Sequence, residues 1–217
     1  SKVKLFDELP DGHMGFPGNL KVETTYKVHK STIDIFIEAS TDKTTLCNFT
    51  NHSYFNLDGT KNIANHNLIV NCENVLPVDK NGIPLSKPVS AKELSLEFKN
   101  SRKLNDDGKP TEIDHNFCIS NTRQNLSTNA ILSTKNISLE LLSTEPGLQI
   151  YTGKGLNSGN DKGWGGHSYK AFAGIALEPQ IWPDSPNQVG FPNPYLSPNE
   201  KYKHHTRIKF SDSNNKK

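Results

Sequence analysis

Three ionisable side chains stand at the ends of strand-like segments: His52 in NHSYFNLDG, Asp114 in DHNFCIS and Glu178 in FAGIALEP. A protonated histidine can donate a proton near neutral pH, and a carboxylate can accept one. These groups are far apart in the chain, so they can meet only through the fold. Taken singly, each is more often a structural or solvated residue than a catalytic one. The high hydrogen-bonding capacity of NHSYFNLDG raises the hypothesis of proton transfer on a hydroxyl-rich ligand, but composition and periodicity alone indicate no more than an all-β domain.

The alternation of side chains along a strand indicates which face each group occupies. His52 follows the segment TTLCNFTN in phase with Asn48 and Thr50, so a polar face leads into the imidazole. Glu178 is in phase with Ala176, and the apolar residues between them point the other way, into a core. A small residue beside a carboxylate leaves room for a ligand.

These groups must be positioned by β-strands. Residues 20–28 and 32–39 alternate cleanly, with Ile33, Ile35 and Ile37 facing inward. Helical periodicity is nearly absent, and the capping box at 197–200 predicts only a short turn. Asp-Gly and Asn-Gly pairs separate the segments. We therefore expect an all-β, antiparallel β-sandwich, with further strands at 44–51, 66–70, 73–78, 116–120, 129–134, 137–144, 148–153, 172–179 and 206–210.

Composition limits the classes of function. The chain has 217 residues and a net charge of +2. This nearly balanced charge does not indicate binding to nucleic acid or to an anionic membrane. We expect one partial domain at 1–210 and a disordered polar tail at 211–217. Cys47, Cys72 and Cys118 are widely spaced and odd in number. That pattern favours free thiols in a reducing compartment, and so a cytoplasmic location.

Several longer stretches carry a resemblance to a known family. In chain order they are PDGHMGFPGNLKVETTYKV, LCNFTNHSYFNLDG, DHNF, EPGLQIYTG and ALEPQIWPDSPNQVGFPNPYLSPNEKY. The set resembles the aldose 1-epimerases, specifically the galactose mutarotases, from about Asp11 to Phe210. The resemblance implies a β-sandwich of the galactose mutarotase type, with the sugar lying across its concave sheet.

The resemblance also implies roles for individual residues. His52 would be the proton donor and Glu178 the proton acceptor, while Asp114 would hold sugar hydroxyls. Gln149 and Tyr54 would line the same pocket. The implied reaction interconverts the α and β anomers of aldohexoses such as galactose and glucose. It proceeds by acid–base ring opening and reclosure, with a small-molecule sugar as the partner and neither a cofactor nor a metal.

One part of the family pattern has no counterpart here. Family members carry an Asn-Arg pair and a second histidine upstream of the matched segments. The N-terminal strands of the sandwich are therefore expected to be missing, so that the chain represents the C-terminal portion of the domain. We expect an exposed apolar face at Ile33, Ile35 and Ile37, and weak activity of this chain alone.

Alternative functions remain at this stage. A non-catalytic carbohydrate-binding β-sandwich would use the same polar face. A hexose-6-phosphate 1-epimerase would need clustered arginines, whereas Arg102, Arg123 and Arg207 are scattered. Covalent fusion to a UDP-galactose epimerase domain in a parent protein also stays open. A metal site is not expected, because the adjacent His204 and His205 should point to opposite faces of a strand.

Overall fold

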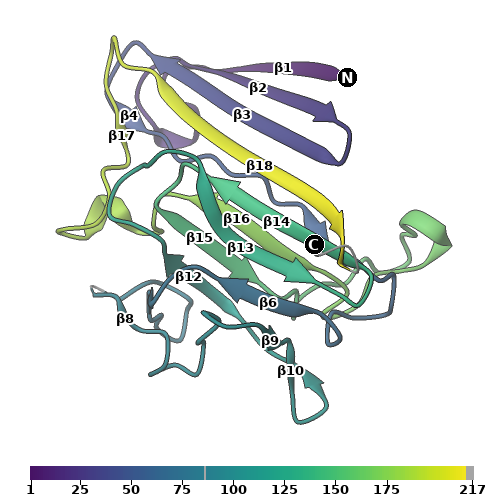
Figure 1. Ribbon diagram of the computed structural model, residues 1–217. Helices are drawn as coiled ribbons and strands as arrows, with labels where there is room; N and C mark the ends of the chain where they lie inside the picture. Colours follow the sequence, from purple (N-terminus) through teal and green to yellow (C-terminus); the bar gives the residue numbers. More distant parts are fainter. Residues whose placement is uncertain (86, 214–217) are drawn as a thin grey trace.

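A computed structural model of the protein describes residues 1–85 and 87–213, and it contains two large antiparallel sheets (Figure 1). In spatial order, the eight-stranded sheet consists of β1 (Lys2–Leu9), β2 (Leu20–His29), β3 (Thr32–Thr41), β18 (Tyr202–Asp212), β14 (Ile137–Ser143), β13 (Ser127–Ser133), β6 (Asn67–Val70) and β9 (Arg102–Lys103). The six-stranded sheet consists of β5 (Tyr54–Phe55), β16 (Ile175–Gln180), β15 (Gly147–Tyr151), β12 (Asp114–Cys118), β7 (Asn74–Val75) and β8 (Val89–Ser90). Two small ladders join β10 (Asn105–Asp106) to β11 (Lys109–Pro110) and β4 (Thr45–Leu46) to β17 (Tyr195–Leu196), and short 3₁₀ turns occur at η1 (His13–Gly15), η2 (Trp164–Gly166) and η3 (Ser185–Asn187).

The two large sheets share one hydrophobic core, which confirms the predicted antiparallel sandwich. Ile35 and Leu139 face inward from the eight-stranded sheet, and Phe117, Ile150 and Leu177 face inward from the six-stranded sheet. All five are at most 5% exposed, since every second side chain of each strand lies between the layers. Removing a side chain of this size from water contributes about 1.5–3 kcal/mol. The core therefore fixes the six-stranded sheet as a rigid platform.

Some predicted boundaries are wrong. The segment predicted as a strand at 44–51 pairs only at Thr45–Leu46, because side-chain hydrogen bonds replace a backbone ladder beyond it: the Asn48 amide bonds to the backbone of Ile181, and the Phe49 N–H donates to the Tyr202 hydroxyl. The strand predicted at 73–78 pairs only at Asn74–Val75, and β1 was not predicted at all. The last strand, predicted to end at Phe210, continues to Asp212; residues 214–217 of the expected tail lie outside the described part of the chain. The turn predicted at 197–200 is present.

The expected exposed apolar face on β3 is also wrong. Ile35 and Ile37 are only 3% and 5% exposed, and Ile33 is partly buried, because this face packs into the shared core. Exposed apolar side chains occur instead on β1, where Val3 is 50% and Phe6 is 72% exposed. β1 pairs only with β2 and forms one edge of the eight-stranded sheet.

A long loop connects β15 to β16, and its two ends are held together. The N–H of Phe172 donates to the carbonyl of Gly153 at 2.8 Å. Gly153 has a positive φ of 73°, and a Cβ there would come within 2.6 Å of the Gly174 carbonyl. Only glycine suits this position. The hydrogen bond from Phe172 to Gly153 fixes the two ends of the loop next to each other, where β15 ends and β16 is about to begin.

Candidate active site

The outer face of the six-stranded sheet carries a row of polar side chains. The register places Asp114 on β12 opposite Tyr151 on β15, and Gln149 on β15 opposite Glu178 on β16. Residues paired across an antiparallel ladder project from the same face of the sheet. Their apolar neighbours point to the opposite face and enter the core. Four polar groups from three adjacent strands therefore share one surface.

His52 reaches this surface from the segment that precedes β5. Tyr54 on β5 pairs with Ala176 on β16, and continuing this antiparallel register by two residues places His52 opposite Glu178. The side chains meet accordingly, with His52 Nε2 3.4 Å from Glu178 Oε1. The Glu178 side chain is 9% exposed, whereas that of His52 is 53% exposed. The pair thus joins a covered carboxylate to an imidazole that solvent can reach.

The environment of Glu178 makes its carboxylate more basic. Burial raises the pKa of Glu178 above its usual 4.5, since a carboxylate loses hydration when covered. The positive charge of His52 opposes this shift, and the negative charge of Asp114 adds to it. A carboxyl group with a raised pKa is a stronger base, as proton abstraction near neutral pH requires.

Asp114 and Gln149 form a second polar unit beside the pair. Gln149 Nε2 donates to Asp114 Oδ1 at 2.8 Å, which orients the carboxylate on the exposed face. A carboxylate offers about four lone-pair sites, so one bond to an amide leaves acceptor capacity for ligand hydroxyls.

Two tyrosines complete the surface, and only Tyr54 was anticipated. The Tyr54 ring lies 5.1 Å from the His52 ring and 6.3 Å from the Tyr151 ring. Ala176 lies between the tyrosines on β16 and is fully buried. The small residue therefore leaves room for the two rings; whether it also leaves room for a ligand stays a prediction. Tyr151 was missed although it is two residues from Gln149, a spacing that puts both on one face.

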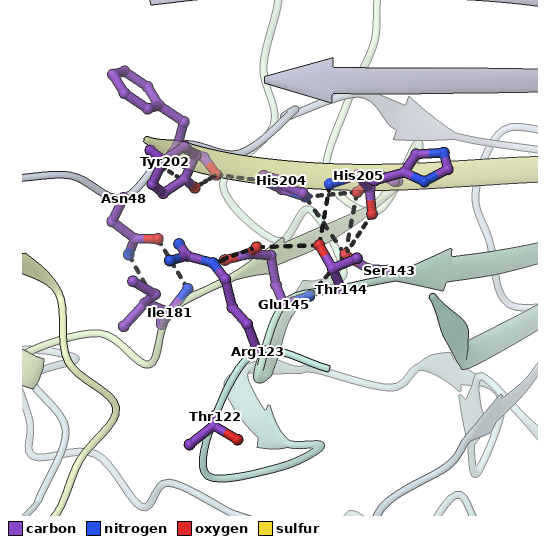
Figure 2. A network of polar contacts seen from close by, with 12 residues as sticks. Asn48, Thr122, Arg123, Ser143, Thr144, Glu145, Ile181, Tyr202, His204 and His205 are labelled. Atoms are coloured by element: carbon purple, nitrogen blue, oxygen red, sulfur yellow. Dashed lines mark hydrogen bonds and ion pairs between the residues drawn. The ribbon is translucent and has the colours of Figure 1, made fainter. Parts of the chain in front are cut away.

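A second polar cluster lies buried between the sheets (Figure 2). Arg123 Nε donates to both carboxylate oxygens of Glu145, at 2.8 and 3.1 Å, and the Glu145 side chain is 0% exposed. His204, only 3% exposed, contacts Thr206 Oγ1 at 2.7 Å. Burial lowers the pKa of His204. The histidine is therefore neutral at pH 7 and acts as part of the core.

His205 points away from this cluster, as predicted for neighbouring strand residues. Its Nε2 lies 2.6 Å from Asp34 Oδ1 on the other side of the sheet. Over residues 1–85 and 87–213, no group of three or more histidine, cysteine, aspartate and glutamate side chains is arranged to hold a metal ion.

The three cysteines, Cys47, Cys72 and Cys118, are free thiols. Burial raises the pKa of each to about 12, so they remain protonated and unreactive at neutral pH. Within the described residues, none of the helical segments has the length and apolar character needed to span a bilayer.

Comparison with known proteins gives consistent relatives. The sequence pattern of the family described as "Aldose 1-epimerase" matches residues 1–209. The chain is 37% identical to the galactose mutarotase of Mus musculus, over 96% of this chain and 63% of the relative. It is 33% identical to the aldose 1-epimerase of Escherichia coli K12, over 92% of this chain and 61% of the relative. The crystal structure of a GalM/aldose epimerase homologue from C. elegans superposes with a TM-score of 0.88, at 27% identity, over 97% of this chain and 66% of that one.

The chain spans 63% and 61% of the length of these two curated relatives. The structural match covers 97% of this chain and therefore extends over both large sheets. The antiparallel sandwich is therefore of the galactose mutarotase type. Because the family pattern covers residues 1–209, the chain belongs to the aldose 1-epimerase family.

Proposed function

We propose that this chain carries the acid–base centre of an aldose 1-epimerase that interconverts the α and β anomers of aldohexoses such as galactose and glucose. The observation that carries the proposal is the pair formed by His52 and Glu178, 3.4 Å apart on an exposed sheet face. The C1 hydroxyl and the ring oxygen of a pyranose share one carbon, so an acid and a base that serve them must be adjacent. This pair meets that requirement.

In the proposed reaction, Glu178 takes the proton of the C1 hydroxyl while His52 gives a proton to the ring oxygen. The bond between C1 and the ring oxygen breaks, and C1 becomes an aldehyde carbon. Rotation about the C1–C2 bond presents the other face of the aldehyde. Closure then runs in reverse: the ring hydroxyl attacks C1, His52 recovers its proton and Glu178 returns the other. Positioned acid and base groups each contribute about 10²–10⁴-fold to such a step.

Three further residues are proposed to bind the sugar. Asp114 would accept hydrogen bonds from sugar hydroxyls, with Gln149 holding its carboxylate in place. Tyr54 would offer a ring surface and a hydroxyl beside His52; burial raises the pKa of Tyr54, so this hydroxyl keeps its proton at neutral pH. Stacking of apolar sugar faces on aromatic rings suits a site of this composition.

The proposal extends to the longer protein in which this site would lie. We infer that residues 1–210 form the C-terminal portion of a family domain, a reading supported by the 60–63% of the curated relatives' length that the chain covers. Further sugar contacts would then come from upstream residues. A parent protein fused to a UDP-galactose epimerase domain and a cytoplasmic location are proposals of the same kind, the latter supported by the free thiols.

The hexose-6-phosphate alternative has less support. Each arginine that could bind a phosphate already contacts a carboxylate: Arg102 contacts Asp106, and Arg207 contacts Asp34. Arg123 contacts Glu145. The three are committed to structural ion pairs on different elements.

Polarimetry tests the proposal. The optical rotation of fresh α-D-galactose should relax faster with the protein than in buffer, with EDTA present and without NAD. The same measurement on an extended parent should show a larger acceleration if upstream residues contribute. Sugar binding without any acceleration, in both the chain and its parent, would identify a non-catalytic binding module.

A further inference from the structure

The segment that carries His52 is not part of a sheet. Residues 47–53 lie between β4 and β5 and have no strand assignment. The distance between His52 and Glu178 nevertheless depends on where this segment lies. Contacts other than a backbone ladder must therefore hold it.

The side chain of Asn48 supplies one such contact. Its amide nitrogen donates to the carbonyl of Ile181 at 3.1 Å, and its amide oxygen accepts the N–H of Ile181 at 2.9 Å (Figure 2). The amide group thereby imitates a backbone residue of an antiparallel ladder. Ile181 directly follows β16, and Tyr54 pairs with Ala176 on the same strand. The segment is thus attached to β16 on both sides of Glu178.

The backbone of Phe49 is held from behind by two buried residues of β18. Its N–H donates to the Tyr202 hydroxyl at 3.2 Å, and its carbonyl lies 3.1 Å from His204 Nδ1. A carbonyl only accepts, so Nδ1 of the neutral His204 carries the proton. Tyr202 and His204 are each 3% exposed, and Arg123 stacks 4.3 Å over the Tyr202 ring. The buried cluster of Figure 2 is therefore a rigid support for the segment.

We propose that Asn48 is a positioning residue: its paired hydrogen bonds to Ile181 set the separation between His52 and Glu178. Asn48 is exposed, so its side chain is not needed to fill the core. Tyr202 and His204 on β18 hold the same segment through the backbone of Phe49. The kinetic part of this inference rests on the proposed function, whereas its geometric part does not.

The test compares wild type with Asn48→Ala by two readouts. The first is the pKa of Glu178, followed by carbon-13 NMR of its carboxyl group. His52, Asp114 and Tyr54 are the titratable groups that interact with this carboxyl, and the His52 charge lowers its pKa. If the segment moves away, both that effect and the burial of the carboxylate change, so the pKa of Glu178 departs from its wild-type value. The second readout is mutarotation, where kcat should fall tenfold or more with KM changed less than threefold, since a displacement of about 1 Å can cost about 10²-fold.

Two further variants test whether the effect is specific to the contacts that hold this segment. Asn19→Ala removes a similar bridging side chain, which accepts from Asp11 N–H at 3.1 Å and donates to Asp42 at 2.6 Å, and so bonds to neither β16 nor the segment at 47–53. It should change neither readout. Tyr202→Phe removes only a hydroxyl from the support behind Phe49, and should shift both readouts in the direction of Asn48→Ala by a smaller amount.

The outcomes separate this inference from the proposed function. A changed pKa of Glu178 in Asn48→Ala, with reduced kcat in an active protein, supports the positioning role of Asn48. An unchanged pKa, or an unchanged kcat in an active protein, overturns it. If wild type gives no mutarotation, the proposed function fails, and the carboxyl titration alone still decides whether Asn48 positions the pair.

Discussion

Two glutamates with basic partners lie on either side of the segment that carries His52, and they differ in how completely they are paired. Glu145 is fully buried and receives two hydrogen bonds from Arg123, at 2.8 and 3.1 Å. Glu178 is slightly exposed and has a single, longer contact of 3.4 Å with His52. The fully buried carboxylate is closed off from any ligand by Arg123 and the core. The carboxylate with the longer contact borders an exposed histidine, which is the arrangement that the proposed reaction needs.

The two histidines of these regions show the same contrast. His204 has both ring nitrogens in fixed contacts, one with the Phe49 carbonyl and one with Thr206. Burial lowers its pKa and keeps it neutral. More than half of the His52 side chain is exposed, so it can exchange protons with solvent between reaction cycles. Exposure and the number of fixed contacts therefore separate these two histidines, which residue type alone does not, and they favour His52 as the proposed proton donor.

The largest expected effect is on the reactive pair. Glu178→Gln keeps the size of the side chain but removes the base, so kcat for mutarotation should fall by about 10²–10⁴-fold. His52→Asn should cause a loss in the same range. Polarimetry on purified variants measures both. Glu112→Gln is the matched control, because this exposed glutamate only pairs with Lys154. Turnover near wild type in Glu178→Gln would exclude Glu178 as the base.

Loss of the buried pair should affect stability much more than catalysis. Arg123→Met leaves the Glu145 carboxylate buried without a partner, which should lower the free energy of unfolding by about 3 kcal/mol. This is the low end of the usual range, since a third of the Arg123 side chain is exposed. Urea unfolding measures the change, and activity per folded molecule should stay within tenfold. A midpoint equal to that of wild type would show that the pair is not structurally important.

The burial of Glu178 should make the stability of the protein depend on pH. Burial gives Glu178 a higher pKa in the folded state than in the unfolded state, so its ionised form costs stability above the folded pKa. That cost is absent below the unfolded value of about 4.5. The difference in Tm between Glu178→Gln and wild type should therefore be more favourable to the variant at pH 7 than at pH 4. Calorimetry at both pH values tests this, and a difference independent of pH would contradict it.

A smaller shift is expected from Asp114. Its negative charge raises the pKa of Glu178, so Asp114→Asn should move the acid limb of kcat/KM to lower pH. KM should rise as well, because an acceptor for sugar hydroxyls becomes an amide. A pH–rate profile records both. An acid limb that moves to higher pH would mean that the two carboxyl groups do not interact in this way.

The alternation of polar and apolar residues predicted most strands of the two sheets, but it missed β1 and placed the end of one strand wrongly. β2 and β3 follow from clean alternation, because one face of each strand is buried. β1 is exposed on both faces, so its sequence has no such signal. The strand predicted at 44–51 ends early because the Asn48 amide replaces a backbone partner, which no periodicity reveals.

The candidate site shows the same limit. Strand phase indicated the faces of His52 and Glu178, and the family motifs singled out Gln149 and Tyr54. The burial of Ala176 beneath two tyrosine rings depends on pairing across three strands, β5, β15 and β16. The role of each site residue stays a prediction, which the variants above test.

The closed base of the loop between β15 and β16 has a consequence for engineering. The loop starts beside Tyr151, whose hydroxyl accepts the Gly155 N–H at 2.6 Å, and it returns just before the strand that carries Glu178. Gly153 and Phe172 already join its ends, so residues beyond Gly155 can be exchanged without opening the base of the loop. Doubling the length of such a loop costs only about 0.6 kcal/mol in closure entropy. Loop exchange is therefore a practical way to change the surroundings of the proposed site while His52 and Glu178 stay in place.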